Sequence, residues 1–89
     1  MSALPRDIER AAALAGSYQT RADAYYEAAA MLAERFGEAG NSPLLDEINS
    51  LRDLAMNCAG ESLKWRGQIV ARNYDPDTVL AIYAKEVAS

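Results

Sequence analysis

Two long stretches of this sequence repeat small or apolar residues every seven positions, and this spacing restricts the folds open to the chain. The row in the first stretch is Ile8, Ala15, Ala22, Ala29 and Phe36. The row in the second stretch is Ile48, Ala55, Ser62 and Ile69. A seven-residue repeat lies along one face of an α-helix and forms a seam against another helix. Each stretch is therefore predicted to be a long helix with one packing face.

Each row has a companion row that widens the predicted seam. In the first stretch the companions are Leu4, Ala11, Tyr18, Tyr25 and Leu32. In the second stretch they are Leu44, Leu51, Cys58 and Trp65. Two helices of similar length that are joined by a short connection pack as antiparallel neighbours. The short polar segment at 37–42 therefore predicts a helical hairpin.

The three prolines predict where the helices begin, because proline is favoured at the first helical position. The predicted helices span residues 5–36, 43–72 and 76–87, each starting at a proline. No strand is predicted. The 89 residues then form a single all-α domain: a hairpin of two long helices plus a short C-terminal helix.

Local signals add detail to these helices. Ser42 and Asp75 precede two of the prolines and are good N-capping residues. Gly16 is a point where the first helix could kink. The third helix is too short to be stable alone, so we expect it to pack on the hairpin or on a neighbouring subunit. Its apolar stripe consists of Val79, Ile82, Tyr83 and Val87.

A turn centred near residue 40 would place residue i opposite residue 80 − i. Trp65 would then face Ala15 and Gly16, and the seam tyrosines would face small residues of the second helix. Large residues opposite small ones suit close helix packing. The predicted core residues are Trp65, Tyr18, Tyr25, Ala15, Ala22 and Ala29.

The composition excludes several classes of function. The chain has no histidine, which removes the commonest metal ligand and general base. Its one cysteine, Cys58, falls on the seam, and no glycine-rich loop follows a predicted strand. We therefore expect no catalytic residues, no metal site and no cofactor.

The charge and the hydropathy of the chain restrict its location and partners. The formal net charge of −4 disfavours direct DNA binding. No apolar run approaches the roughly 20 residues that span a bilayer, and no signal segment is evident. A single cysteine fits a reducing compartment. We expect a cytoplasmic protein without membrane contact.

Self-association is expected from the size and the composition of the chain. Eighteen of the apolar residues are alanine, so few side chains contribute much hydrophobic burial. A core of this size is marginal in a single chain. Further apolar residues flank the seam: Leu14, Tyr26, Met31, Leu54, Leu63 and Val70. We expect a homo-oligomeric helical bundle.

Positive charge gathers where the first helix begins and the second ends. The cations there are Arg6, Arg10, Lys64, Arg66 and Arg72. Two interpretations stay open. The cations can match the helix dipole and pair with nearby acids, or they can form a phosphate pocket with Tyr74 stacked on a base.

An acidic stripe on the second helix gives another hypothesis. Asp46, Asp53 and Glu61 share one helical face. Such a face is commonly solvated surface, but it could also imitate a phosphate backbone and occupy a nucleic-acid-binding protein.

The stretch "DLAMNCAGESLKWRGQIVARN", residues 53–73, resembles a helix of the small phage proteins that act as anti-CBASS cyclic-oligonucleotide sponges. The positions that match are Leu54, Ala55, Glu61, Trp65, Ala71, Arg72 and Asn73. The segment "RADAYYEAAAML" from Arg21 is similar to the first helix of that family. The resemblance implies a helical homo-oligomer that holds a nucleotide messenger between subunits without cleaving it. It also implies that Arg72 and Asn73, and then Arg21, lie near the ligand.

Three functions are compatible with these features. The first is a non-catalytic, phage-type inhibitor of host defence that sequesters a nucleotide second messenger in the host cytoplasm, with Arg66 and Tyr74 completing the binding set. The second is a small acidic inhibitor or adaptor that docks on a host protein through the acidic stripe. The third is a structural or secretion-associated helical hairpin.

Overall fold

The computed structural model describes residues 4–37 and 44–88, and every regular element in these ranges is helical. Its helices are α1 (Arg6–Phe36), α2 (Leu45–Ala71) and α3 (Pro76–Ala88). The all-α prediction is confirmed for this part of the chain, and the predicted helix bounds lie within two residues of those observed. The predicted start at Pro43 and cap at Ser42 lie outside the described residues.

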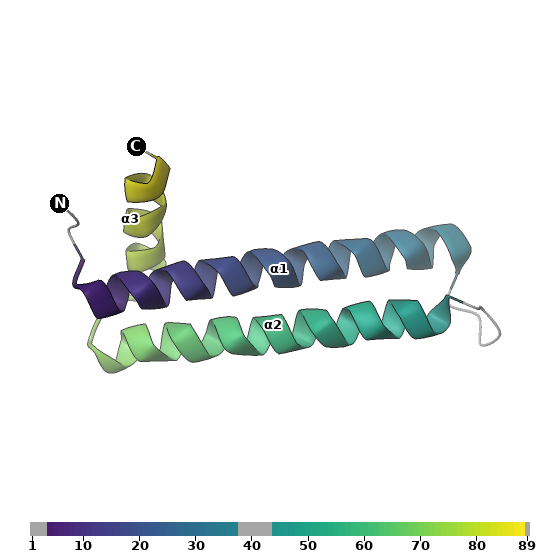
Figure 1. The fold of residues 1–89 in the computed structure, drawn as a ribbon, viewed down its shortest axis with the longest axis horizontal. Coiled ribbons are helices and arrows are strands. Elements are labelled where there is room, and N and C mark those ends of the chain that lie inside the picture. Colours follow the sequence, from purple (N-terminus) through teal and green to yellow (C-terminus); the bar gives the residue numbers. More distant parts are fainter. Residues whose placement is uncertain (1–3, 38–43, 89) are drawn as a thin grey trace.

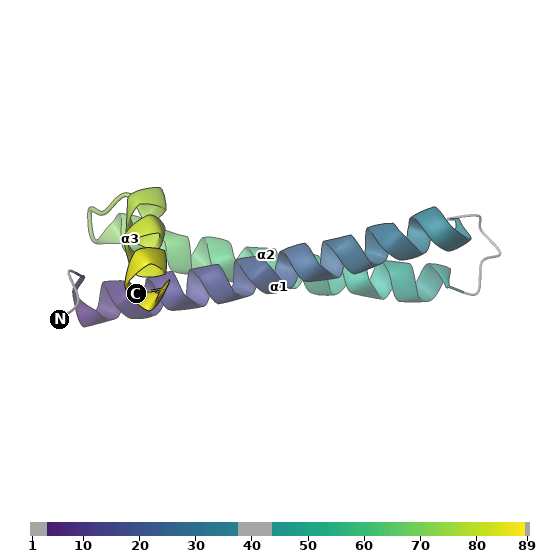
Figure 2. The same ribbon diagram turned by 90° about the horizontal axis from the view of Figure 1, so that it is seen from above.

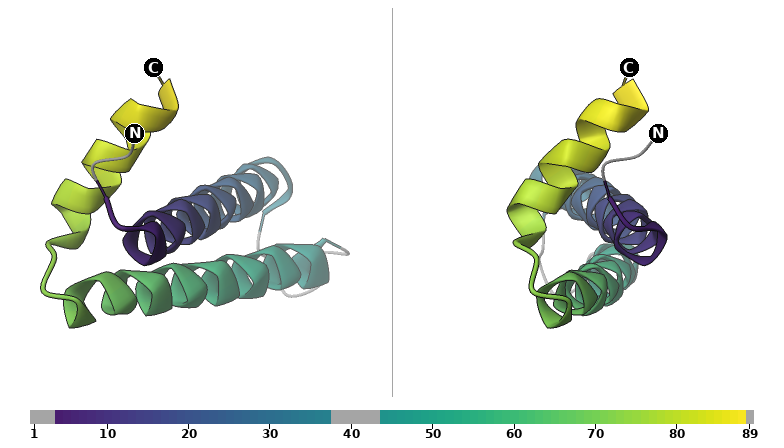
Figure 3. Two further views of the ribbon diagram at one scale, coloured as in Figure 1. Left: turned by 60° about the vertical axis from the view of Figure 1, so that its left-hand side comes forward. Right: turned by 90° about the vertical axis from the view of Figure 1, so that its left-hand side faces the viewer.

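Helices α1 and α2 run antiparallel and lie side by side for most of their length (Figures 1 and 2). They form an elongated molecule of 54 × 27 × 15 Å. Helix α3 crosses the hairpin steeply at the end where α1 begins and α2 ends, which we call the open end (Figure 3). The open end therefore combines parts of all three helices.

The alanine row of α1 forms the floor of the seam. Ile8, Ala15, Ala22 and Ala29 are all buried, and so is the α2 row. That α2 row consists of Ile48, Ala55, Ser62 and Ile69. Phe36 breaks the pattern because its side chain is 54% exposed. It is the last residue of α1, and no residue of α2 lies opposite it to cover the ring.

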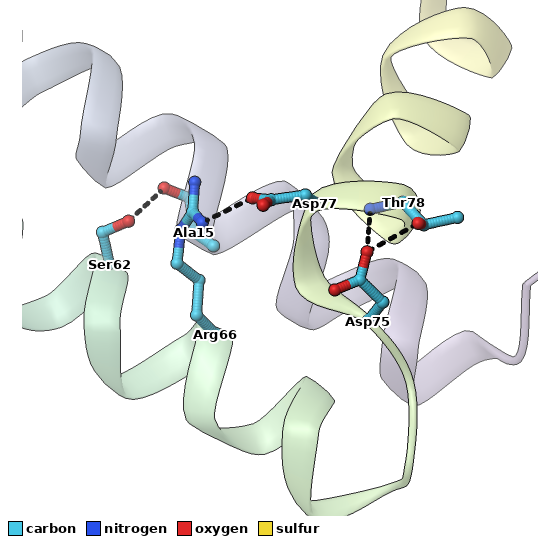
Figure 4. Close-up of polar contacts among 6 residues, drawn as sticks. All are labelled: Ala15, Ser62, Arg66, Asp75, Asp77 and Thr78. Atoms are coloured by element: carbon cyan, nitrogen blue, oxygen red, sulfur yellow. Dashed lines mark hydrogen bonds and ion pairs between the residues drawn. The ribbon is translucent and has the colours of Figure 1, made fainter.

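A buried hydrogen bond shows the register of the hairpin. The Ser62 hydroxyl donates to the main-chain carbonyl of Ala15 at 2.9 Å (Figure 4). Residue i thus faces about residue 77 − i, which seats Ile48 against Ala29. The prediction that residue i faces residue 80 − i was wrong by about three residues. The register is set by the packing of these side chains and not by the midpoint of the connection. Trp65 consequently lies nearer Ala12 than Ala15.

The largest cluster of buried residues lies at the open end. It consists of Leu4, Ile8, Ala11, Ala12, Ile69 and Val79, with Trp65, Leu80, Ile82 and Tyr83 packed against it. Val79 is 2% exposed, so α3 folds onto its own hairpin. Helix α1 continues through Gly16, and the kink that this glycine allowed does not occur.

The large aromatic residues of the predicted core lie at its edges. Trp65, Tyr18 and Tyr25 are half-buried, whereas Ala15, Ala22 and Ala29 are fully buried. Alanines along the centre let the two helices approach closely, and this leaves no room there for rings. The rings therefore flank the seam.

The turn between α2 and α3 is closed by two main-chain hydrogen bonds. The N–H of Asn73 donates to the Val70 carbonyl at 2.9 Å, and that of Tyr74 to the Ile69 carbonyl at 3.2 Å. Asn73 has a φ of 65°. These two hydrogen bonds, together with a residue in the left-handed conformation, form a Schellman motif. Asparagine is a usual substitute for glycine at that position.

Asp75 caps the N-terminus of α3. One of its carboxylate oxygens accepts the Thr78 hydroxyl at 2.6 Å and the Thr78 main-chain N–H at 3.1 Å (Figure 4). These two hydrogen bonds, the hydroxyl first, lower the pKa of the Asp75 carboxyl below its ordinary value. The predicted cap is confirmed, and it fixes where α3 leaves the hairpin.

Candidate functional site

A hollow of about 420 Å³ opens between α1 and α2 at the open end of the hairpin. We call it the open-end hollow. Its lining residues are Asp7, Ile8, Arg10, Ala11, Trp65, Gln68 and Arg72. Ile8 and Ala11 belong to the buried cluster and form an apolar floor. Charged and amide groups surround that floor.

Helical spacing accounts for the composition of the hollow. Trp65, Gln68 and Arg72 are separated by three and four residues, so they project from one face of α2. On α1, Asp7 and Arg10 are three residues apart and share a face in the same way. The indole is half-buried against the core cluster and lines the hollow, and the Nζ of Lys64 lies 5.9 Å from the centroid of its ring.

Arg72 is held by an ion pair with Asp7, which joins the end of α2 to the start of α1. Both side chains are 54% exposed, so water screens the pair and its contribution to stability is small. Such a pair can open when another anion binds the guanidinium. Arg72 thus follows the first of the two sequence interpretations, in which the cations pair with nearby acids.

Arg10 differs from Arg72 in its partners. Its side chain is exposed, and no carboxylate among the described residues pairs with it. With Arg72 and Asp7, it gives the hollow a formal charge of +1. An arginine in this position offers several N–H donors in a fixed plane, which match the oxygens of a phosphate or carboxylate.

Four of the predicted ligand residues do not line the hollow. Arg66 projects about 120° around α2 from Arg72 and pairs with Asp77 of α3 at 3.1 Å (Figure 4). Asn73 closes the turn described above, and Tyr74 is exposed in that turn. Arg21 lies over the Tyr18 ring, 5.5 Å from its centroid, about 16 Å along α1 from Arg10.

Gln68 was missed by the sequence reasoning, and Arg10 was named only as one of several cations. The signal was present, because Gln68 falls between Trp65 and Arg72 on the same helical face. Arg10 was recoverable from the register, since the sum of 77 places it opposite residue 67, next to Gln68. Asp7 is one of the nearby acids that the sequence interpretation paired with these cations, and its ion pair with Arg72 agrees with that interpretation.

The acidic stripe lies away from the hollow. Asp46 and Asp53 are exposed on α2, and Glu61 is half-buried. No ion pair to Asp46 or Asp53 occurs in the described ranges. The two carboxylates are therefore accessible on the surface.

A second concave surface lies between α1 and α3. It has a volume of about 500 Å³ and is mostly apolar. Its walls include Gly16, Leu80, Tyr83 and Val87, with Arg66 at its edge. Val87 is 65% exposed.

In residues 4–37 and 44–88, no group of three or more His, Cys, Asp or Glu side chains is arranged to hold a metal ion. None of the helices in these ranges is both long and apolar enough to cross a membrane.

No protein-family profile, curated protein or solved structure matches this chain. The resemblance to the phage sponge proteins therefore stays a prediction, and function has to be argued from the site itself.

Proposed function

We propose that this chain is a non-catalytic binding protein that holds a small anionic ligand, specifically a nucleotide, in the open-end hollow. The observation that carries the proposal is the pairing of Arg10 and Arg72 with the indole of Trp65 around one apolar floor. Arginines bind phosphate oxygens, and an aromatic ring beside them can stack on a base. Gln68 supplies one further donor and acceptor for a polar base edge.

Binding would exchange one weak interaction for a stronger one. A phosphate entering the hollow would replace Asp7 as the partner of Arg72, and it would also meet Arg10. The two guanidinium groups would then act on the same phosphate group, whereas Arg72 alone now contacts the Asp7 carboxylate. Because both arginines are exposed, we expect the affinity to fall as ionic strength rises.

The same site supports sequestration more than turnover. A binding protein that keeps its ligand intact needs complementary charge and a concave surface, and a positively charged hollow of about 420 Å³ supports this role. The resemblance to the sponge family supports a cyclic oligonucleotide as the ligand and removal of a defence signal from the host cytoplasm as the result.

Calorimetric titration of the full chain tests this function. The probes are cyclic di-AMP, cyclic di-GMP, a cyclic trinucleotide, AMP and inorganic phosphate. We expect a nucleotide to bind more tightly than inorganic phosphate, since only the nucleotide can use the indole. Arg10→Gln and Arg72→Gln should each weaken binding by about tenfold or more, as expected for a lost charge-assisted contact.

Arg21→Gln is the matched control. It removes the same charge from an exposed site on α1 that lies outside the hollow, and it should leave binding unchanged. If Arg21→Gln abolishes binding while Arg72→Gln does not, the ligand site is elsewhere and the assignment of the hollow is wrong. Absence of any heat with every probe would also contradict the proposal.

A second candidate is docking on a host protein through the acidic stripe. It is favoured by the exposure of Asp46 and Asp53 without ion-pair partners in the described ranges. Capture of a purified basic partner that is lost in Asp46→Asn/Asp53→Asn, but not in Arg72→Gln, would support this function in place of the first.

A further inference from the structure

One face of α2 carries a regular row of exposed apolar residues that the hairpin leaves uncovered. Met56, Leu63 and Val70 follow one another at seven-residue spacing and are 62%, 68% and 55% exposed. Gly60 and Gly67 lie between them, and a Cβ placed on either glycine would meet no neighbouring atom within 4 Å. We call these five residues the outer stripe. Its spacing is that of a helix seam, yet no other helix in residues 4–37 and 44–88 covers it.

The surface area of the chain is larger than that of a compact monomer of its mass, which leaves enough surface for an interface. A compact monomer of this mass exposes about 5,100 Å², whereas this chain exposes 6219 Å². The excess is comparable in size to the roughly 800 Å² that each partner buries in a standard protein interface.

The edge of the outer stripe carries two opposite charges that cannot meet within one helix. Asp53 and Lys64 lie on the same side of the stripe, and neither has an ion-pair partner in the described part of the chain. They are 11 positions apart, or about 16 Å along the helix axis. An antiparallel second copy of α2 would bring the Asp53 of each copy to the Lys64 of the other.

We propose that the outer stripe is the interface of a two-fold symmetric homodimer in which the two α2 helices pack antiparallel around Gly60. In this arrangement Met56 of one copy packs against Leu63 of the other, and Asp53 pairs with Lys64. The side-chain-free surface at Gly60 lets the two backbones approach at the two-fold axis. The interface is self-complementary, as a two-fold axis requires.

The second copy is favoured over an unrelated partner by this complementarity. Around an axis at Gly60, residue i of one copy faces about residue 120 − i of the other. This single rotation brings Met56 close to Leu63 and Asp53 within reach of the long Lys64 side chain.

The proposed dimer interface and the proposed ligand site lie on different faces of α2, with Lys64 between them: its Nζ lies 5.9 Å from the centroid of the Trp65 ring. Trp65 projects about 160° around α2 from Leu63, so each open-end hollow stays accessible in the dimer. A variant that no longer binds the ligand should therefore still dimerise, and a variant that no longer dimerises should still bind the ligand.

Sedimentation equilibrium of the full chain tests the oligomeric state. We expect a dimer that dissociates at least about a hundredfold more readily in Leu63→Asp, because the change occurs twice at the centre of the interface. Met31→Asp is the matched control, since Met31 is 63% exposed on α1. It should dimerise like the original chain. Far-ultraviolet circular dichroism confirms that both variants remain helical.

A charge exchange tests the direction of packing. Asp53→Lys and Lys64→Asp should each weaken dimerisation by about tenfold through two repulsive contacts, whereas the double variant should return to within about threefold of the original chain. This rescue requires the two residues to face each other across the interface.

Cross-linking tests the register. With Cys58→Ser as background, Gly60→Cys should form a disulfide-linked dimer on mild oxidation, because only residues near the axis meet their own copy at disulfide distance. Met56→Cys should link to Leu63→Cys in a mixture more readily than to itself. A monomer at all concentrations, a Leu63→Asp chain that dimerises normally, or failure of the charge exchange to rescue would each overturn the proposal.

Discussion

The hydroxyl of Ser62 on α2 donates a buried 2.9 Å hydrogen bond to the main-chain carbonyl of Ala15 on α1. Ser62 is the one buried polar residue of the described chain, and its hydroxyl is satisfied. The bond places Ser62 of α2 directly beside Ala15 of α1. It explains why a serine occupies a seam position that otherwise takes small apolar residues.

Ser62→Ala should cost about 1 kcal/mol of unfolding free energy, since it removes one hydrogen bond and leaves the small volume unchanged. Ser62→Leu should cost about 1–3 kcal/mol because the seam has no space for it. Urea unfolding followed by circular dichroism measures both. Ser50→Ala, at an exposed position of α2, is the control and should lie within about 0.5 kcal/mol of the original chain.

Ile48→Ala should destabilise the protein by about 2–5 kcal/mol, because Ile48 is fully buried at the far end of the seam. Phe36→Ala should change stability by less than about 0.5 kcal/mol, since that ring is 54% exposed. The seven-residue pattern placed both residues on the seam, whereas the structure buries only Ile48. Comparing the two variants therefore tests which of the two descriptions is right. Equal losses for the two variants would contradict the observed packing.

Asn73→Gly should leave stability unchanged or raise it slightly, because glycine adopts a φ of 65° without strain. Asn73→Ala should lower stability by about 1 kcal/mol, since alanine is disfavoured in the left-handed region. Thermal unfolding measures the difference. Ligand binding should survive Asn73→Gly, whereas a direct role of the amide in the site would require its loss.

The cap at Asp75 should make the docking of α3 sensitive to acid. The hydrogen bonds from Thr78, the hydroxyl first, lower the pKa of this carboxyl below its ordinary value in the folded chain. A carboxyl whose pKa is lower in the folded chain than in the unfolded chain stabilises the fold at pH values above its unfolded pKa. This stabilisation is lost as the pH falls through the folded pKa. Fluorescence of Trp65, which shares the core cluster with α3, should report loosening below about pH 4.

Asp75→Asn supplies the control for that experiment. Asparagine caps helices well but does not titrate in this range. The variant should therefore lose the part of the acid response that Asp75 contributes, while the titrations of the other carboxylates persist. An unchanged acid profile in Asp75→Asn would assign the response to other groups.

Much of the fold was predictable from local sequence. The buried row of α2 and four members of the α1 row followed from the seven-residue spacing, and the α3 cap followed from Asp75 before Pro76. These features depend on residues close together in the chain. The spacing could not show that the first row ends in an exposed Phe36, because that depends on where α2 begins to cover α1.

The candidate site was less predictable. Its position at the open end followed from antiparallel pairing, and Arg72 was named. Arg66 and Asn73 were assigned to it as well, but each has another contact that only the three-dimensional arrangement reveals, to Asp77 and to the Val70 carbonyl. Sequence neighbours that project in different directions around a helix cannot serve the same pocket.

The narrow seam between α1 and α2 has an evolutionary consequence. Ala15, Ala22 and Ala55 can be exchanged only for glycine or serine without forcing the helices apart, whereas most outward positions can drift freely. Distant descendants of this protein should thus keep small residues at seven-residue spacing even when their overall sequence identity is low. This spacing of small residues, present in both antiparallel helices, would be the feature by which a common origin could be recognised.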